Sequence, residues 1–195
     1  MRNPVLIGER VYLRALEPDD AEPFARMDAV EADTFMYRQR FPSSPMEHAH
    51  WIEEAYKERP PHSIPFAVGA RADDRLLGVV GVDDLDWVNR TGETFSFLGP
   101  AEVRGQGYGT EAKHLLLGYC FDRLHLHVLR SEVDQPNTRS AAALLKQGYR
   151  RAGALKWVDV KGGRYIDQYL FDVTRPDWIA AHRAWLDSRG AAKSD

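Results

Sequence analysis

The feature that most constrains the fold is a glycine-rich loop, "VRGQGYGTEA" (Val103–Ala112), between a predicted strand and a predicted helix. Three glycines in five residues carry a large entropy cost, which a chain tolerates where the backbone turns sharply or something approaches closely. The strand "ETFSFLG" precedes the loop, and the helix, Thr110–Leu124, leads into the strand "HVLRSEV". This order predicts an α/β (α+β) domain with a strand–loop–helix–strand crossover in its middle.

The rest of the chain supplies further strands and helices around this crossover. Alternating apolar residues and turn signals predict strands over Arg10–Leu16, Ile64–Ala70, Leu76–Val82, Gly153–Val160 and Arg164–Val173. Helical patterns cover residues 17–30, 43–59, 137–147 and 176–188. The last two strands form a hairpin about Gly162–Gly163. We therefore expect one domain over residues 1–188, with a mainly antiparallel sheet of about seven strands, and a disordered tail over 189–195.

Composition excludes several classes of protein. Apolar residues make up 44% and charged residues 28% of 195 residues, as in ordinary soluble domains. A single cysteine, Cys120, cannot form an internal disulfide, and no apolar run reaches the length of a membrane span. Residues 1–97 hold 11 Lys/Arg against 18 Asp/Glu, and residues 98–195 hold 15 against 11, without a dense basic stripe. We expect a cytoplasmic protein that binds neither membrane nor nucleic acid.

The glycine loop has the composition of an anion-binding site. No Gly-Lys-Ser/Thr follows the glycines, so it is not a Walker A loop, and the spacing does not fit the dinucleotide fingerprint either. What remains is Arg104-x-x-Gly107-x-Gly109 before a helix, which directs backbone N–H groups toward a pyrophosphate. The alternative is a tight turn that uses glycines for steric reasons alone.

Several motifs in order resemble the GNAT superfamily of N-acetyltransferases. The loop is similar to the R/Q-x-x-G-x-G/A acetyl-CoA signature, and "NTRSAAALLKQGYRRAG" is similar to the second family motif. The segments "GERVYLRALEPDDA", "DLDWVNR" and "DQYLFDVTRPDW", together with Glu93, resemble the RimJ/RimL branch, which acetylates protein N-termini. The resemblance covers residues 5–180.

The resemblance implies the GNAT fold, in which a splayed central parallel pair of strands forms the acetyl-CoA cleft. It implies acetyl-CoA as co-substrate and no metal. Backbone N–H groups of the loop would hold the pyrophosphate, with added charge from Arg104; the loop residues are Val103, Arg104, Gly105, Gln106, Gly107, Tyr108, Gly109 and Thr110. Backbone groups of Phe97, Leu98 and Gly99 would bind the pantetheine amides. Asn137 and Ser140 match polar positions of the second motif, although Asn137 also suits a helix N-cap.

Catalysis requires a base for the amine and an acid for the leaving thiolate. The resemblance implies Glu93 as the base. Many family members carry a tyrosine as the acid where this chain has Leu144, so Ser140 or an ordered water is the expected proton donor to sulfur. Tyr149 replaces the usual phenylalanine and is expected to pack.

The acceptor side is less constrained. Asp83, Asp84 and Asp86 border the expected face and could bind an ammonium group, or they could belong to a solvated loop, Asp83–Gly92. Trp87 could form a wall of the acceptor pocket or cover the core. His125 and His127 could begin a metal site, but the sequence offers no third ligand at useful spacing.

Three functions remain open at this point. The first is acetyl transfer to the N-terminal α-amine of a protein or peptide, and the second is acetylation of a small amine or aminoglycoside. The third is an acyl-CoA-binding sensor without turnover. The sequence names neither the amine acceptor nor the oligomeric state, so a homodimer also stays open.

Overall fold

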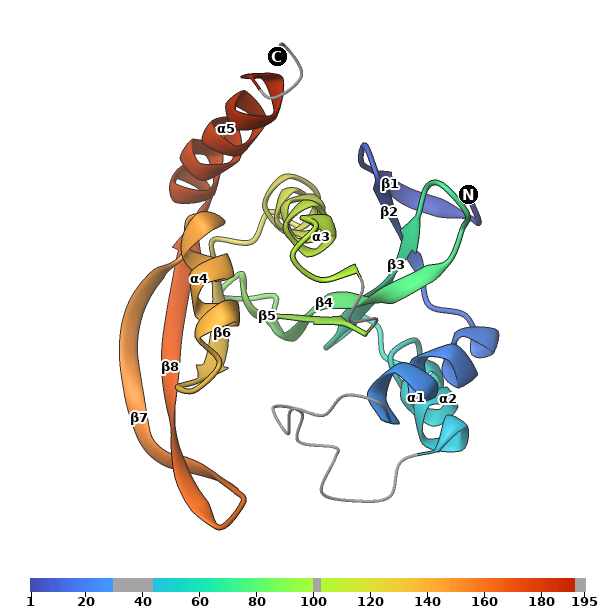
Figure 1. The fold of residues 1–195 in the computed structure, drawn as a ribbon, viewed down its shortest axis with the longest axis horizontal. Coiled ribbons are helices and arrows are strands. Elements are labelled where there is room, and N and C mark those ends of the chain that lie inside the picture. The colour runs from blue at the N-terminus through green and yellow to red at the C-terminus, as the bar shows by residue number, and fades with distance from the viewer. Residues whose placement is uncertain (30–43, 100–102, 192–195) are drawn as a thin grey trace.

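The computed structural model describes residues 1–29, 44–99 and 103–191. Eight strands form one sheet in the order β1-β2-β3-β4-β5-β6-β8-β7 (Figure 1). Their bounds are β1 Pro4–Ile7, β2 Val11–Ala15, β3 Ile64–Ala70, β4 Leu76–Asp86, β5 Thr91–Leu98, β6 Val128–Asp134, β7 Arg150–Lys161 and β8 Arg164–Thr174. The predicted mixed, mostly antiparallel sheet is confirmed, and the strand that the prediction of about seven omitted is β1.

In the part of the chain that the structure describes, five α-helices accompany the sheet. They are α1 (Ala21–Ala29), α2 (Pro45–Glu54), α3 (Tyr108–Gly118), α4 (Thr138–Lys146) and α5 (Arg175–Ala191). A 3-10 turn, Pro18–Asp20, precedes α1, and a π-helical turn, Tyr119–Arg123, continues α3. Within the described ranges, none of the helices is long and apolar enough to cross a membrane.

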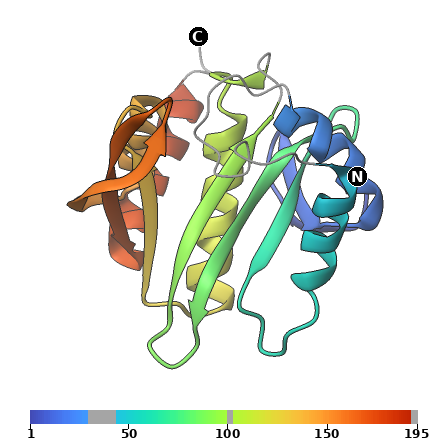
Figure 2. The ribbon, with the colours of Figure 1, turned by 90° about the horizontal axis from the view of Figure 1, so that it is seen from below.

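The centre of the sheet is a short parallel pairing between β5 and β6. Their register runs from Thr91 opposite Val128 to Glu93 opposite Arg130, and both strands continue beyond it. Figure 2 shows the two strands close at one end and diverging toward the other. The crossover through α3 thus joins a splayed parallel pair, as the GNAT resemblance implies.

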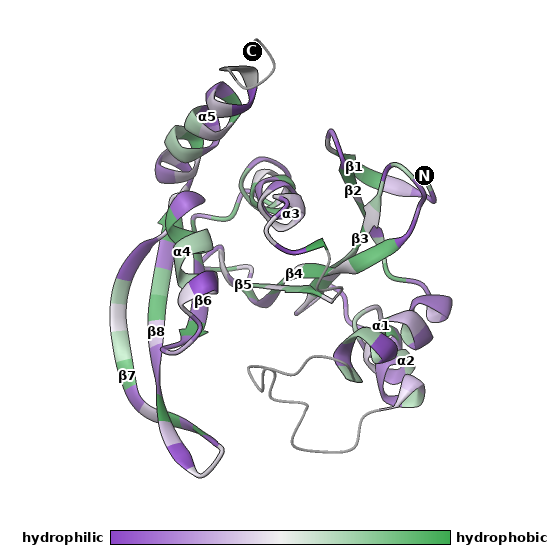
Figure 3. Cartoon of the chain, in the orientation of Figure 1, coloured by the Kyte–Doolittle hydropathy of each residue, from purple (hydrophilic) through white to green (hydrophobic). Residues whose placement is uncertain are grey.

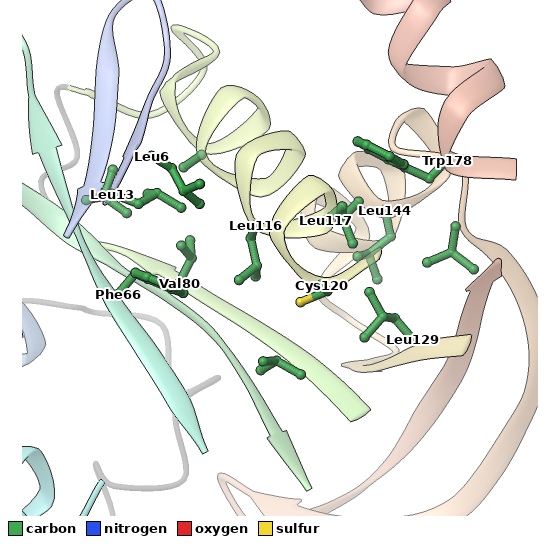
Figure 4. Packing of buried hydrophobic residues seen from close by; sticks show 14 of the residues in the cluster. Leu6, Leu13, Phe66, Val80, Leu116, Leu117, Cys120, Leu129, Leu144 and Trp178 are labelled. Atoms are coloured by element: carbon green, nitrogen blue, oxygen red, sulfur yellow. The ribbon is translucent and has the colours of Figure 1, made fainter. Parts of the chain in front are cut away.

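The main core lies between α3 and the sheet. Ala112, Leu116 and Cys120 of α3 and its extension are fully buried, whereas Leu115 and Tyr119 are half-buried. Figure 4 shows Leu116 and Cys120 pointing from α3 and its extension toward the sheet; the labelled neighbours from the strands are Leu6, Leu13, Phe66, Val80 and Leu129. Three polar residues of α3 are also buried, namely Glu111, Lys113 and His114.

Helices α1 and α2 cover the opposite face of the sheet at β3–β5. A second apolar cluster joins Phe24 of α1 and Ile52 of α2 to Phe97 of β5, with the Phe24 and Phe97 ring centroids 5.5 Å apart. Strands β3 and β4 are therefore covered on both faces, which explains their nearly continuous burial and their hydrophobic colour in Figure 3.

The C-terminal part of the chain contains one confirmed turn and one corrected boundary. Gly162 and Gly163 have φ angles of 55° and 74°, as a two-residue hairpin turn requires. Helix α5 continues to Ala191, so residues 189–191 do not belong to the predicted tail, and residues 192–195 lie outside the described ranges. Arg189 pairs with Glu111 at 3.1 Å and with Glu9, which ties the end of α5 to the body.

Candidate active site

The glycine loop enters α3 in the conformation that an anion cradle needs. Gly105 and Gly107 have φ angles of 74° and 84°, and Gly107 is the N-cap of α3. A Cβ placed at Gly105 would meet nothing within 4 Å, so the space beside this backbone is open. The N-terminus of α3, with its unpaired N–H groups and positive dipole end, faces the same loop. These features fit a bound pyrophosphate.

Arg10 is a loop contact that sequence reasoning missed. Its Nη1 donates to the Gln106 carbonyl at 2.7 Å, and its guanidinium carbon lies 5.0 Å from the Tyr108 ring centroid. Its Nη2 would lie 2.8 Å from a Cβ on Gly107. Arg10 precedes the loop by almost a hundred residues, and no local pattern could have linked the two. It places a positive charge beside the cradle.

Arg104 does not point its charge into the loop in this structure. Its Nε donates to the Leu98 carbonyl at 3.1 Å and its Nη2 donates to the Gly99 carbonyl at 2.8 Å. Arg104 therefore fastens the loop to the end of β5, at backbone groups expected to meet pantetheine. Phe97 points its side chain into the second apolar cluster, and its backbone pairs with Val79 of β4.

The second motif lies at the start of α4. The Asn137 side chain accepts a hydrogen bond from the Ser140 backbone N–H at 3.1 Å, so Asn137 is the N-cap of this helix. Ser140 is half-buried in the first turn. Leu144, at the position of the family's tyrosine, is buried in the main core beside Cys120 and Leu129 (Figure 4).

Ser140→Ala should slow turnover by about 10-fold, because an ordered water can also donate the proton to the sulfur. This is less than the effect of removing a well-placed general acid, which is about 10²–10⁴-fold. Leu144→Tyr should give no gain, since a larger side chain overpacks a filled core. Steady-state rates measure both effects, with exposed Thr138→Ala in the same turn as the control. An unchanged turnover rate of Ser140→Ala together with a higher rate of Leu144→Tyr would contradict the role of Ser140 at the sulfur. It would favour a sensor in which the position of the general acid is vacant.

Tyr149 does more than pack. Its hydroxyl lies 2.6 Å from Thr94 Oγ1, and Thr94 Oγ1 in turn donates to the Arg130 carbonyl at 3.2 Å. Ser131 Oγ donates to the Thr94 carbonyl at 3.0 Å. The two bonds of Thr94 to Arg130 and Ser131 join β5 to β6 at the point where the strands begin to diverge, and Tyr149 adds a third bond to Thr94. Burial raises the pKa of Tyr149, so its hydroxyl stays protonated.

Glu93 stands beside this point and has the electrostatics of a base. Its side chain is half-buried, and its pKa is raised from 4.5 to about 7. Burial is the largest cause, the carboxylates of Glu132, Asp84 and Asp83 add to it, and Lys113 opposes them. A base with a pKa near the working pH is the most effective one.

The predicted acceptor residues differ from the loop that the sequence suggested. Asp83–Asp86 belong to β4 and Thr91–Gly92 to β5, so only residues 87–90 connect these strands. Asp84 lies in a bulge at a φ of 48° and pairs with His62 at 2.9 Å. Asp86 accepts bonds from the Val88 and Asn89 backbone N–H groups, which gives it a structural role in the turn.

Trp87 packs as part of the scaffold. Its indole N–H donates to the Pro61 carbonyl at 2.9 Å, and its ring contacts the main core. Of the two interpretations that the sequence allowed, packing accounts for these contacts. Within the described residues, no group of three or more His, Cys, Asp or Glu side chains is placed to hold a metal ion.

Comparison with known proteins places this geometry in one family. Residues 10–150 match the acetyltransferase (GNAT) domain model. The chain is 27% identical to the "SPbeta prophage-derived uncharacterized N-acetyltransferase YokL" of Bacillus subtilis over 176 residues, covering 90% of this chain and 96% of YokL. It is 23% identical to the "Putative ribosomal N-acetyltransferase YdaF" of B. subtilis, covering 88% and 95% of the two chains.

Solved structures share the fold. A chimera of the spermidine N-acetyltransferase SpeG from Vibrio cholerae and hSSAT superposes with a TM-score of 0.78 at 20% identity, covering 88% of this chain and 99% of the chimera. The residues that form the loop, the splayed strands and Glu93 all fall within the matched family region. This chain belongs to the GNAT acetyltransferase family, whose members transfer an acetyl group from acetyl-CoA to an amine.

Proposed function

We propose that this enzyme acetylates the N-terminal α-amine of a protein or peptide, as the RimJ/RimL branch does. The observation that carries the proposal is Glu93, whose pKa is raised to about 7. Proton transfer to such a base from an α-amine of pKa about 7.8 costs about 1 kcal/mol, whereas transfer from a lysine-type amine of pKa about 10.4 costs about 4.6 kcal/mol. The base is therefore matched to an α-amine.

In this proposal, each group of residues has a separate task that follows from its position. The loop backbone from Gly105 to Thr110 and the nearby Arg10 hold the pyrophosphate of acetyl-CoA. The edge of β5 beyond Glu93, where the register with β6 ends, holds the pantetheine arm. Bound acetyl-CoA supplies the thioester, Glu93 accepts the amine proton, and Ser140 hydrogen-bonds the sulfur. Transfer is direct, and Cys120 is buried and takes no part.

A polyamine is the second candidate acceptor, and the carboxylates around Glu93 favour it. The carboxylates of Asp83, Asp84 and Glu132 all raise the pKa of Glu93 through their negative charge. Such a cluster of negative charge attracts a polycation. The fold neighbour SpeG is named as a spermidine N-acetyltransferase, whereas the relative YdaF is named as a ribosomal one. The base strength of Glu93 favours the α-amine.

Thiol release from acetyl-CoA at pH 7 distinguishes these acceptors. The panel contains a peptide with a free N-terminus, the same peptide with that terminus blocked and an internal lysine free, and spermidine. We expect the free N-terminus to react at least about 100-fold faster than the blocked peptide, from the difference in proton-transfer cost. Faster reaction with spermidine would favour the polyamine, and no turnover with any amine would favour the sensor.

A further inference from the structure

Helix α3 buries a carboxylate directly after the glycine loop. Glu111 lies in the first turn of the helix and is 2% exposed. Burial acts to raise its pKa, but hydrogen bonds from Arg10, Arg189 and Val11 outweigh burial and hold the pKa below its usual 4.5. Replacing a buried ion pair by apolar residues is often neutral for stability, so packing alone does not require a carboxylate here.

The contacts of Glu111 fix the orientation of Arg10 in the turn between β1 and β2. Glu111 Oε1 accepts a hydrogen bond from the Arg10 backbone N–H at 2.8 Å, and Oε2 accepts one from Arg10 Nε at 3.4 Å. Gly8 leaves room for the carboxylate, because a Cβ at Gly8 would clash with Glu111 Oε1. Arg189 of α5 adds a further bond to Oε2 at 3.1 Å. The backbone and the side chain of Arg10 are therefore both tied to α3.

Arg10 in turn holds one peptide unit of the glycine loop. Its Nη1 donates to the Gln106 carbonyl at 2.7 Å. In a planar trans peptide unit the C=O and N–H groups point in opposite directions, so the N–H of Gly107 points away from Arg10. Gly107 is the N-cap of α3, and its N–H adjoins the helix N-terminus where an anion binds best. A chain of contacts thus runs from Glu111 through Arg10 to this N–H group.

We propose that Glu111 is a positioning residue for acetyl-CoA. Through Arg10 it holds the peptide unit between Gln106 and Gly107 in the orientation that presents the Gly107 N–H to the pyrophosphate. The proposal rests on the proposed function, which assigns the pyrophosphate to this loop. Glu111 acts from beneath the loop and does not contact the reacting atoms. Its loss therefore weakens the binding of acetyl-CoA and leaves the chemical step unchanged.

Glu111→Gln tests the proposal because glutamine has the same size but no charge. Its single oxygen can accept from the Arg10 backbone or from Arg10 Nε, but not from both. We expect the Kd of acetyl-CoA to rise about 10-fold, the effect of one well-placed hydrogen bond, and kcat at saturating acetyl-CoA to stay within about twofold. Calorimetry and steady-state rates measure the two quantities. Unchanged affinity in a folded variant would overturn the proposal.

A double-mutant cycle with Arg10→Met tests the route of the effect. Arg10→Met should also raise the Kd about 10-fold, and adding Glu111→Gln should raise it no further, because Glu111 acts through Arg10. Independent effects, which would raise the Kd of the double variant about 100-fold, would overturn the proposal. Arg10 is 40% exposed, so its single variant keeps the test open if Glu111→Gln does not fold. An unchanged Kd of Arg10→Met would also overturn the proposal.

Arg71→Met is the matched control for the β1–β2 turn. Arg71 Nη1 donates to the carbonyls of Gly8 and Glu9 at 2.8 and 3.1 Å, and in the described part of the chain its side chain bonds to no residue of the loop. We expect the Kd of acetyl-CoA to stay at the wild-type value. A 10-fold rise would show that any loosening of the turn weakens binding, which would overturn the proposal. A wild-type enzyme that binds no acetyl-CoA would instead contradict the proposed function.

Discussion

Glu93→Gln lowers kcat by about 100-fold or more at neutral pH and leaves the acetyl-CoA affinity nearly unchanged. The amide keeps the shape of the side chain but accepts no proton, and general base catalysis contributes about 10²–10⁴-fold. In the wild type, activity should rise with pH through about 7 as Glu93 ionises, and this acidic limb should disappear in the variant. Steady-state rates across pH with calorimetric affinities measure both effects.

Glu132→Gln is the matched control for this prediction. Glu132 is exposed on β6, and its charge raises the pKa of Glu93. Removing that charge should move the acidic limb to lower pH while kcat at its plateau stays close to the wild-type value. A near-wild-type rate for Glu93→Gln at every pH would show that another group or a water takes the amine proton.

Gly107→Val abolishes acetyl-CoA binding in a variant that still folds. The φ of 84° at Gly107 lies in the left-handed region, which costs a β-branched residue more than about 1 kcal/mol. A side chain here also meets Arg10 Nη2 at 2.8 Å, so both the loop backbone and the nearby cation must shift. The N–H groups of the cradle then no longer converge, and calorimetry should detect no binding.

Gly162→Val provides the control for backbone strain. Gly162 also has a positive φ, 55°, and a Cβ there meets nothing within 4 Å, but it lies in the β7–β8 turn. We expect this variant to bind acetyl-CoA with wild-type affinity. Unchanged affinity in a folded Gly107→Val variant would refute the assignment of the loop.

The parts of the fold that the sequence predicts are those with a local cause. A two-residue hairpin turn requires positive φ angles, which glycine adopts readily, so the pair Gly162–Gly163 predicts the position of the turn. Gly148, with a φ of 95°, follows the end of α4, which the helical pattern places at residue 147 and the structure at Lys146. The order of strand, glycine loop, helix and strand led to the central parallel pair, because a crossover is needed to join two parallel strands.

The parts that it does not predict depend on distant contacts. Strand β1 has only four residues, and it forms because β2 pairs with it. Helix α5 extends past Ser188 because Arg189 finds Glu9 and Glu111, far away in the sequence. Aspartate is depleted in strands, but Asp86 is the last residue of β4, because it still pairs with Thr91 of β5.

The candidate site shows the same division. Motif spacing predicted the glycine loop and the start of α4, which lie where the helices α3 and α4 begin, whereas Glu93 inside β5 was suggested only by the family resemblance. Arg10 was not predicted, because nothing in its neighbours along the chain indicates a contact with the loop. Arg104 was expected to face a phosphate, but its geometry suits the two carbonyls at the end of β5. Side-chain direction is a tertiary property.

The central claim is acetyl transfer to an α-amine with Glu93 as the base, and one peptide tests it directly. The peptide carries a free N-terminal α-amine and an internal lysine and is incubated with the enzyme and acetyl-CoA at pH 7. Tandem mass spectrometry then locates the acetyl group. We predict acetylation of the α-amine, absent with Glu93→Gln. An acetyl group on the lysine side chain, or none with the wild-type enzyme, would contradict the claim.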